Sequence, residues 1–223
     1  MLLNAAMSID GKICTRSGDS KFSDEEDWRQ VHAIRASVDA IMVGINTVIQ
    51  DNPSLRIKYW PARSPLVRVV VDSACRIPVN ARVLDIDPQL APTIVCVTER
   101  ASIERQRAIE ALGADVIAVN EGARVDVKKM ITCLYQRNIR TVLLEGGGTL
   151  NWSMVEARLV DEIRLCIAPV LVGGQGAKSL VEGTGFNLVE DSLSFHLHSV
   201  EPRGDRIIVR YKRQDARSLG LER

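Results

Sequence analysis

The sequence lacks the features that would place it in a membrane, outside the cell or around a metal ion. No run of about 18 apolar residues is present, so no transmembrane helix is predicted. The N-terminal stretch has no basic segment and carries an acid at Asp10, which is not typical of a secretory signal. The five cysteines are scattered, and no two are spaced as zinc ligands. We therefore expect a reduced, cytoplasmic protein without a metal site.

Neither sign of charge is in excess. The sequence holds 29 lysine and arginine residues against 28 acids, and a net charge of +1 gives no basis for a nucleic-acid partner. It also lacks internal repeats, linkers and low-complexity segments. With 223 residues, it is long enough for one full-sized hydrophobic core. We predict a single domain over residues 1–213, followed by a polar tail over 214–223.

Short apolar segments alternate with amphipathic ones along the chain. Strands are predicted at residues 2–9, 39–45, 67–71, 93–97, 116–119, 141–144, 162–172, 193–200 and 206–211. Helices are predicted at residues 46–50, 102–112, 125–137 and 151–159. A further helix is predicted from the capping signature S-x-x-E at Ser23 and Glu26. The alternation predicts an α/β fold with a mostly parallel sheet flanked by helices and a C-terminal antiparallel hairpin.

The stretch 141–152, TVLLEGGGTLNW, combines a strand, an acid, three glycines and the start of a helix. Glu145 ends the strand, and Gly146, Gly147 and Gly148 follow it. Such a loop exposes backbone N–H groups, and the helix N-terminus adds partial positive charge, so the arrangement suits a phosphate group. Neither the fingerprint G-x-G-x-x-G nor a P-loop lysine is present. The residues leave two interpretations open, a phosphate site or a tight turn.

Polar residues after two other predicted strands are further candidates. Thr47 and Asp51 lie four residues apart on a short helix and face the same way, although Asp51 also precedes an Asn-Pro pair that ends helices. Ser73 follows the strand over 67–71. It is either part of a turn or a contact to a ribose or its 2′-phosphate, with Arg76 as the charge partner for the phosphate. The glycine-rich loop 173–176 is compatible with ligand binding, a dimer contact or a turn.

Six motifs occur together in a fixed order: AMSIDGK (6–12), SGDSKF (17–22), IRASVDAIMVGINTVIQDNPSL (34–55), VVVDSACRIP (69–78), LLEGGGTLN (143–151) and APVLVGG (168–174). Together they resemble the riboflavin-biosynthesis reductase family, which includes the C-terminal domain of the bacterial deaminase–reductase and free-standing archaeal and fungal enzymes. The H-x-E and P-C-x-x-C zinc signature of the deaminase domain is absent. The chain thus resembles the stand-alone reductase.

The resemblance implies a dihydrofolate-reductase-like fold, a homodimer and an oxidoreductase that uses NADPH, with NADH possible. The implied substrate is 2,5-diamino-6-ribosylamino-4(3H)-pyrimidinone 5′-phosphate, a small molecule whose ribosyl group is reduced to a ribityl chain. One alternative is a dihydrofolate- or pteridine-type reductase on the same fold, because fold does not fix substrate. The other is a non-catalytic nucleotide-binding module.

The resemblance also implies roles for individual residues. Cofactor contacts are implied for Thr47, Asp51, Ser73, Gly146, Gly147, Gly148 and Thr149. Arg76 is a further cofactor candidate, as the charge partner for a 2′-phosphate beside Ser73. Substrate contacts are implied for Ser20, Phe22, Arg35, Leu55, Lys58 and Glu145. Phe22 and Lys58 stand where bacterial domains often carry tryptophan and arginine, and Arg56 is an alternative to Lys58 for a phosphate. The candidate proton donors are Asp51, Glu145, Lys12 and water.

Overall fold

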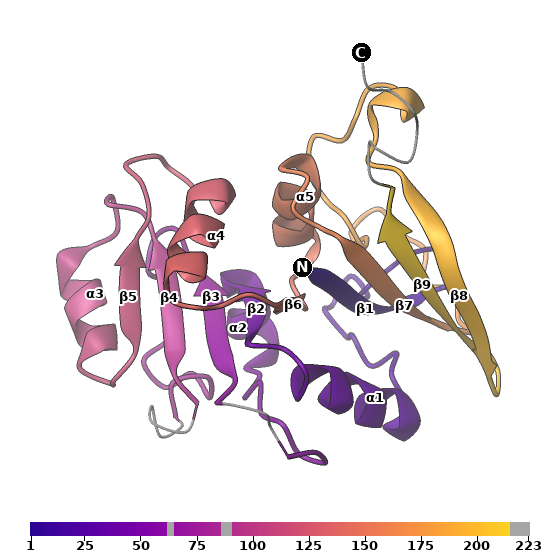
Figure 1. Cartoon of the computed structure of the whole chain (residues 1–223), viewed down its shortest axis with the longest axis horizontal. Helices are drawn as coiled ribbons and strands as arrows, with labels where there is room; N and C mark the ends of the chain where they lie inside the picture. The colour runs from indigo at the N-terminus through magenta and orange to yellow at the C-terminus, as the bar shows by residue number, and fades with distance from the viewer. Residues whose placement is uncertain (62–64, 86–90, 215–223) are drawn as a thin grey trace.

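A nine-stranded sheet organises the chain (Figure 1). The computed structural model describes residues 1–61, 65–85 and 91–214. The strands are β1 (Leu2–Ser8), β2 (Ala40–Gly44), β3 (Val67–Val71), β4 (Thr93–Val97), β5 (Asp115–Ala118), β6 (Val142–Leu144), β7 (Glu162–Ala168), β8 (Phe195–Arg203) and β9 (Arg206–Arg213). Their order is β5-β4-β3-β2-β6-β1-β7-β9-β8.

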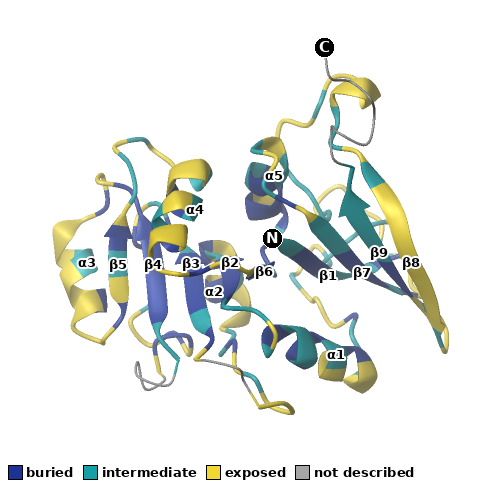
Figure 2. Ribbon diagram, viewed as in Figure 1, coloured by how far each residue is buried: buried dark blue, intermediate teal, exposed yellow. Residues whose placement is uncertain are grey.

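The sheet is parallel from β5 through β7, and the hairpin of β8 and β9 joins it in antiparallel fashion along β7. The prediction of a mostly parallel sheet with a C-terminal antiparallel hairpin is confirmed. Two strands, β3 (VRVVV) and β4 (TIVCV), have the predicted bounds, because runs rich in β-branched residues suit strands buried on both faces. Figure 2 shows this burial in the centre of the sheet and the exposed edge strand β8.

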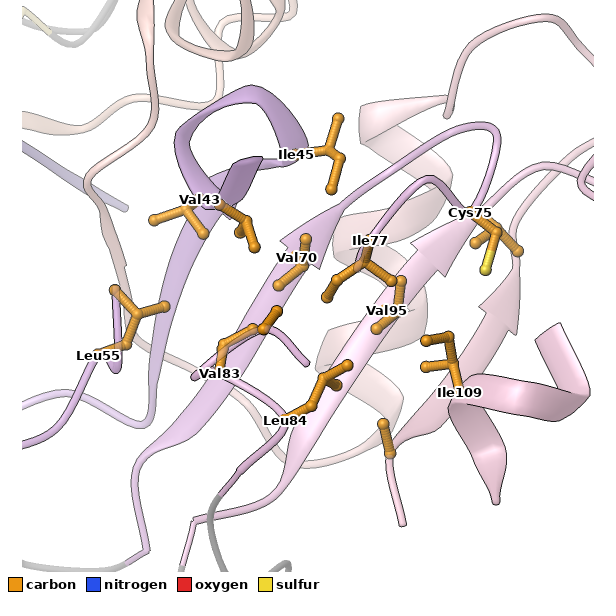
Figure 3. Close-up of a cluster of buried hydrophobic side chains, with 14 of the residues drawn as sticks. Val43, Ile45, Leu55, Val70, Cys75, Ile77, Val83, Leu84, Val95 and Ile109 are labelled. Carbon is orange, nitrogen blue, oxygen red and sulfur yellow. The ribbon is translucent and has the colours of Figure 1, made fainter. Parts of the chain in front are cut away.

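Five helices and one 3₁₀ turn accompany the sheet in the part of the chain described: α1 (Glu25–Arg35), α2 (Ile45–Asp51), α3 (Ile103–Glu110), α4 (Val127–Gln136), α5 (Gly148–Glu156) and η1 (Val189–Asp191). Alternate residues of the central strands point to opposite faces of the sheet and build two cores. One core joins Val43 and Val70 to Ile45 of α2 and Ile109 of α3 (Figure 3). The other joins strands to α4 and α5 and includes Met42, Val69, Met130, Leu134 and Met154.

Most other predicted boundaries differ from the structure by a few residues, and three of these differences have an identifiable cause. Helix α1 begins at Glu25 because the side chain of Asp24, rather than Ser23, accepts a hydrogen bond from the backbone N–H of Asp27. Helix α5 begins at Gly148, three residues earlier than predicted, so the glycine loop supplies its first turn. Strand β7 ends at Ala168, directly before Pro169, which cannot donate to a ladder.

From residue 215 on, the predicted polar tail lies outside the described residues. Among the helices described, none combines the length and the apolar content that crossing a bilayer requires.

Candidate functional site

A cavity of about 520 Å³ opens at the carboxyl ends of the parallel strands. Its wall includes Ala6 of β1, Gly44 of β2, Val71 of β3 and the residues that follow β6. Strand order decides this convergence, because β6 is paired between β1 and β2 although it lies far from both along the chain. Open α/β sheets bind their ligands at this edge. The cavity is therefore the candidate active site.

The glycine loop forms one wall of the cavity. Gly147 has a φ of +93° and is the N-cap of α5, which no side chain caps. A Cβ atom at Gly147 would lie 3.1 Å from Thr47 Oγ1, and one at Gly148 would lie 2.7 Å from the carbonyl oxygen of Ser179. The Thr47 hydroxyl donates to the Gly146 carbonyl at 3.0 Å and ties the loop to α2. The first-turn N–H groups of α5 can therefore meet an anion, and this wall fits a dinucleotide pyrophosphate.

Glu145, immediately before the loop, is held by a two-pronged ion pair. Arg35 Nε donates to Glu145 Oε1 at 3.0 Å, and Arg35 Nη2 donates to Oε2 at 2.6 Å. A third donor, Arg35 Nη1, reaches the carbonyl oxygen of Arg56 at 3.1 Å. The two side chains are 7% and 15% exposed, and only Glu145 belongs to the cavity wall. Arg35 thus fixes the carboxylate from behind.

Asp51, at the end of α2, lines the cavity and is exposed to solvent. Desolvation by the surrounding wall raises the pKa of its carboxyl group above the usual value. A carboxyl group with a raised pKa is better suited to donate a proton near neutral pH. One residue earlier, Gln50 meets Gly18 so closely that a Cβ atom on Gly18 would overlap its amide. The loop before α1 and helix α2 therefore touch across the cavity.

Basic residues gather at the outer end of the cavity. Arg76 Nη2 donates to Asn46 Oδ1 at 3.0 Å, and Arg76 Nε lies 3.9 Å from Asp72 Oδ1. Ser73 Oγ accepts from the backbone N–H of Val125 at 3.1 Å, which brings the loop after β5 beside Ser73. That loop also places Arg124 in the cavity wall. Arg124 did not figure in the sequence prediction, because it follows Ser73 by about fifty residues and carries no motif.

The structure places the remaining predicted residues at different depths. Thr149 and Ser20 line the cavity with the residues above, whereas Phe22, Arg35, Leu55, Lys58 and Lys12 are not part of its wall. Phe22 and Leu55 are buried, and Leu55 has a φ of +52°. Lys58 is exposed and its backbone N–H donates to His32 Nδ1 at 3.2 Å. Lys12 Nζ donates to Ser179 Oγ at 3.1 Å and to the Ala177 carbonyl.

Three buried polar residues at the floor of the site were not predicted. Arg164 Nη1 donates to Asn4 Oδ1 at 2.9 Å, and Arg164 Nη2 donates to Asp27 Oδ1 at 2.6 Å. Asn4 and Asp27 line the cavity, with Arg164 beneath them on β7. One signal in the sequence could have revealed Asn4, since it is an amide inside an otherwise apolar strand. A buried amide of this kind requires a hydrogen-bonding partner.

Comparison with known proteins identifies the family. A family model described as the RibD C-terminal domain matches residues 1–209. The chain belongs to this family. It is 44% identical over 214 residues to the 2,5-diamino-6-ribosylamino-4(3H)-pyrimidinone 5′-phosphate reductase of Methanothermobacter thermautotrophicus, covering 95% of this chain and 96% of the relative. A protein of the same name from Aquifex aeolicus is 41% identical over 217 residues, covering 95% of each.

Solved structures show the same fold. The deaminase/5-amino-6-(5-phosphoribosylamino)uracil reductase of Thermotoga maritima matches 96% of this chain with a TM-score of 0.76 and 24% identity. This chain spans 56% of the length of that protein. The riboflavin biosynthesis reductase of Saccharomyces cerevisiae gives a TM-score of 0.71 at 21% identity over 96% of this chain and 89% of the yeast chain. The predicted dihydrofolate-reductase-like fold is confirmed by the structural neighbours, which include RibD reductase domains.

Proposed function

We propose that this chain reduces the ribosyl group of 2,5-diamino-6-ribosylamino-4(3H)-pyrimidinone 5′-phosphate to a ribityl group, with a nicotinamide cofactor as hydride donor. The observation that carries the proposal is the 44% identity, over nearly the full length of both chains, to a reductase named for that substrate. Relatives at 41% and 38% identity have the same name, so a dihydrofolate- or pteridine-type activity and a non-catalytic role are not favoured.

The cavity supports the use of a dinucleotide. The glycine loop and the first turn of α5 would hold the pyrophosphate, and Ser73, Arg76 and Arg124 would meet a 2′-phosphate at the outer end. Two guanidinium groups there favour NADPH over NADH, since the 2′-phosphate is the only charge that distinguishes the two cofactors. When bound, the cofactor supplies the hydride that reduces C1′ of the ribosyl group.

The remaining chemistry concerns charge and protons. A ribosylamine opens to a cationic imine when its ring oxygen takes up a proton, and the imine carbon C1′ then accepts hydride. The Glu145 carboxylate, which Arg35 fixes at the cavity wall, would stabilise that positive charge. Asp51 is the proposed proton source, because its raised pKa favours the protonated form. Lys12 is bonded to the loop after β7 and takes no part in the proposed step.

The test is absorbance at 340 nm, which follows nicotinamide oxidation. The purified chain is mixed with NADPH or NADH and with either the pyrimidinone phosphate or dihydrofolate. Oxidation that depends on the pyrimidinone phosphate is expected, with a higher kcat/KM for NADPH than for NADH. Oxidation with dihydrofolate alone, or with neither substrate, would refute the proposed activity.

We also propose a homodimer. The edge strand β8 exposes Leu197 and Val200, which are 55% and 51% accessible, together with backbone groups along its outer edge. An exposed apolar edge strand favours pairing with another chain. Light scattering on a sizing column should give twice the chain mass of 24.6 kDa. A single 24.6 kDa species at assay concentrations would contradict the proposal.

A further inference from the structure

The floor of the cavity carries a hydrogen-bond donor and a hydrogen-bond acceptor that take no part in the proposed reduction. Asn4 is 8% exposed and Asp27 is 3% exposed, and both belong to the cavity wall. The guanidinium group of Arg164, 1% exposed, donates to both of them, to Asn4 Oδ1 at 2.9 Å and to Asp27 Oδ1 at 2.6 Å. One buried cation therefore holds the amide and the carboxylate side by side.

The arginine also decides which way the amide points. A guanidinium group can only donate hydrogen bonds, so the oxygen of the Asn4 side chain must face Arg164. The amide nitrogen Nδ2 is then the polar group that Asn4 offers to the cavity. At this point the floor presents a hydrogen-bond donor.

The carboxylate of Asp27 supplies the acceptor. Its Oδ1 accepts from Arg164, and its Oδ2 accepts from the hydroxyl of Ser23 at 2.6 Å. A carboxylate has about four acceptor positions on its two oxygens, so these two bonds leave capacity for a ligand. The neighbouring thiol of Cys166 has a pKa raised to about 12, by burial and then by the charge of Asp27. Asp27 therefore acts as a fixed, desolvated acceptor at the floor.

One edge of the proposed substrate carries the matching groups. In a 2-amino-4(3H)-pyrimidinone, the 2-amino group and N3–H are adjacent donors, and the 4-oxo group beside them is an acceptor. We infer that Asp27 accepts from the 2-amino group and N3–H while Asn4 Nδ2 donates to the 4-oxo group. The inference rests on the proposed function and adds how the ring is recognised.

This arrangement predicts discrimination at one ring position. The Thermotoga maritima protein is named as a reductase of the uracil compound, in which an oxygen replaces the 2-amino group. In this chain such an oxygen would meet the carboxylate of Asp27, with lone pairs facing lone pairs and one acceptor unpaired. Sites built to bond a substrate N–H reject analogues that lack it by factors of about 10⁴ or more. We expect at least about a 100-fold preference for the 2-amino compound.

The first experiment needs no variant. kcat/KM is measured with NADPH for the 2,5-diaminopyrimidinone ribosyl phosphate and for the corresponding 5-aminouracil compound. A preference of at least about 100-fold for the diamino compound is expected. Equal kcat/KM values would overturn the inference and leave the proposed function standing. Turnover of neither compound would overturn the proposed function itself.

Two variants then locate the preference. Asp27→Asn keeps an oxygen for Arg164 but replaces an acceptor with a donor, so the preference should fall at least about tenfold. Asn4→Ser weakens the contact to the 4-oxo group, which both substrates share, so both kcat/KM values should fall while their ratio stays constant. A folded Asp27→Asn enzyme with the wild-type ratio would overturn the inference.

Glu26→Gln is the matched control. Glu26 lies on the same helix as Asp27 but is 67% exposed and outside the cavity wall. In Glu26→Gln, kcat/KM for each substrate and the ratio of the two values should therefore match wild type. Thermal melting checks that each variant is folded, because Asp27→Asn leaves Arg164 without a charged partner. If Asp27→Asn does not fold, the wild-type preference and the constant ratio in Asn4→Ser still decide the question.

Discussion

Glutamine at position 145 would keep the shape of Glu145 and remove its charge. In the structure Arg35 donates to both carboxylate oxygens, at 3.0 and 2.6 Å, and the two side chains are 7% and 15% exposed. Glutamine retains one acceptor, so Glu145→Gln removes about one charge-assisted bond, worth roughly 2 kcal/mol. For a chain of this size, 1 kcal/mol corresponds to about 2–4 °C in Tm. We therefore expect Tm to fall by roughly 4–8 °C while the protein stays folded.

Arg35→Met tests the same pair from the other side. It leaves a largely buried carboxylate without its cation and removes the donor to the Arg56 carbonyl. Breaking a buried pair in this way costs about 3–5 kcal/mol. In the double variant no unpaired charge remains. Its loss of unfolding free energy should therefore be smaller than the sum of the losses in the two single variants, by more than about 1 kcal/mol.

Activity separates the chemical role of Glu145 from its structural one. Because a neutral amide cannot stabilise a cationic imine, Glu145→Gln should lower kcat/KM by about 100-fold or more at temperatures where it is folded. The control is Asp115→Asn, which breaks an exposed pair with Arg137 and should change stability by less than about 1 kcal/mol with activity intact. Wild-type kcat/KM in Glu145→Gln, or strictly additive losses in the double variant, would refute the reasoning.

Three further predictions concern a proton, a glycine and a histidine. If Asp51 donates the proton, kcat should decline as pH rises through its raised pKa, and Asp51→Asn should be slow at every pH without that decline. Gly147→Ala should lose about 1–3 kcal/mol of stability, since φ is +93° there, and calorimetry should show weaker cofactor binding. The control is Gly204→Ala, at φ +54° in an open turn, which should leave cofactor affinity unchanged. Burial, then the charge of Arg35, lowers the pKa of His32 to about 4. The unfolded chain therefore binds the extra proton first, and stability should fall as pH drops from about 6.5 to 4. Denaturant titrations should show that the free energy of unfolding depends less on pH in His32→Asn, a variant that keeps an acceptor for the Lys58 N–H.

The sequence predicted the sheet well where strands are rich in β-branched residues, as in β3 and β4. The predicted start of α5 was wrong. The N-cap is Gly147, and a glycine marks a helix start less clearly than serine, aspartate or asparagine does. Thr47 and Glu145 could be singled out as candidates from local patterns. Their meeting in one cavity depends on β6 lying beside β2, which chain order does not reveal.

The sequence could mark Asn4 as a strand amide that needs a partner, but it could not identify the partners at the floor of the cavity, for a related reason. Asn4 and Asp27 receive their roles from Arg164, which is 160 and 137 residues away along the chain. An isolated asparagine in a strand or an acid in a first helical turn indicates no partner by itself. The pairing of β1 with β7 sets Asn4 beside Arg164, and the position of α1 adds Asp27 to the same guanidinium group.

The position of β1 has a consequence for how the protein folds. Although β1 precedes the other eight strands in the sequence, its neighbours in the sheet are β6 and β7, with Leu2 opposite Leu143 and Glu162. The chain loses the entropy of closing such long loops before it gains the strand contacts that offset this loss. Sheets of this kind therefore form slowly. A nascent chain that ends before residue 142 holds β1 with neither neighbour and cannot yet enclose the cavity. Ligand binding would therefore mark the last stage of folding, and ligand should protect mainly the finished chain from proteolysis.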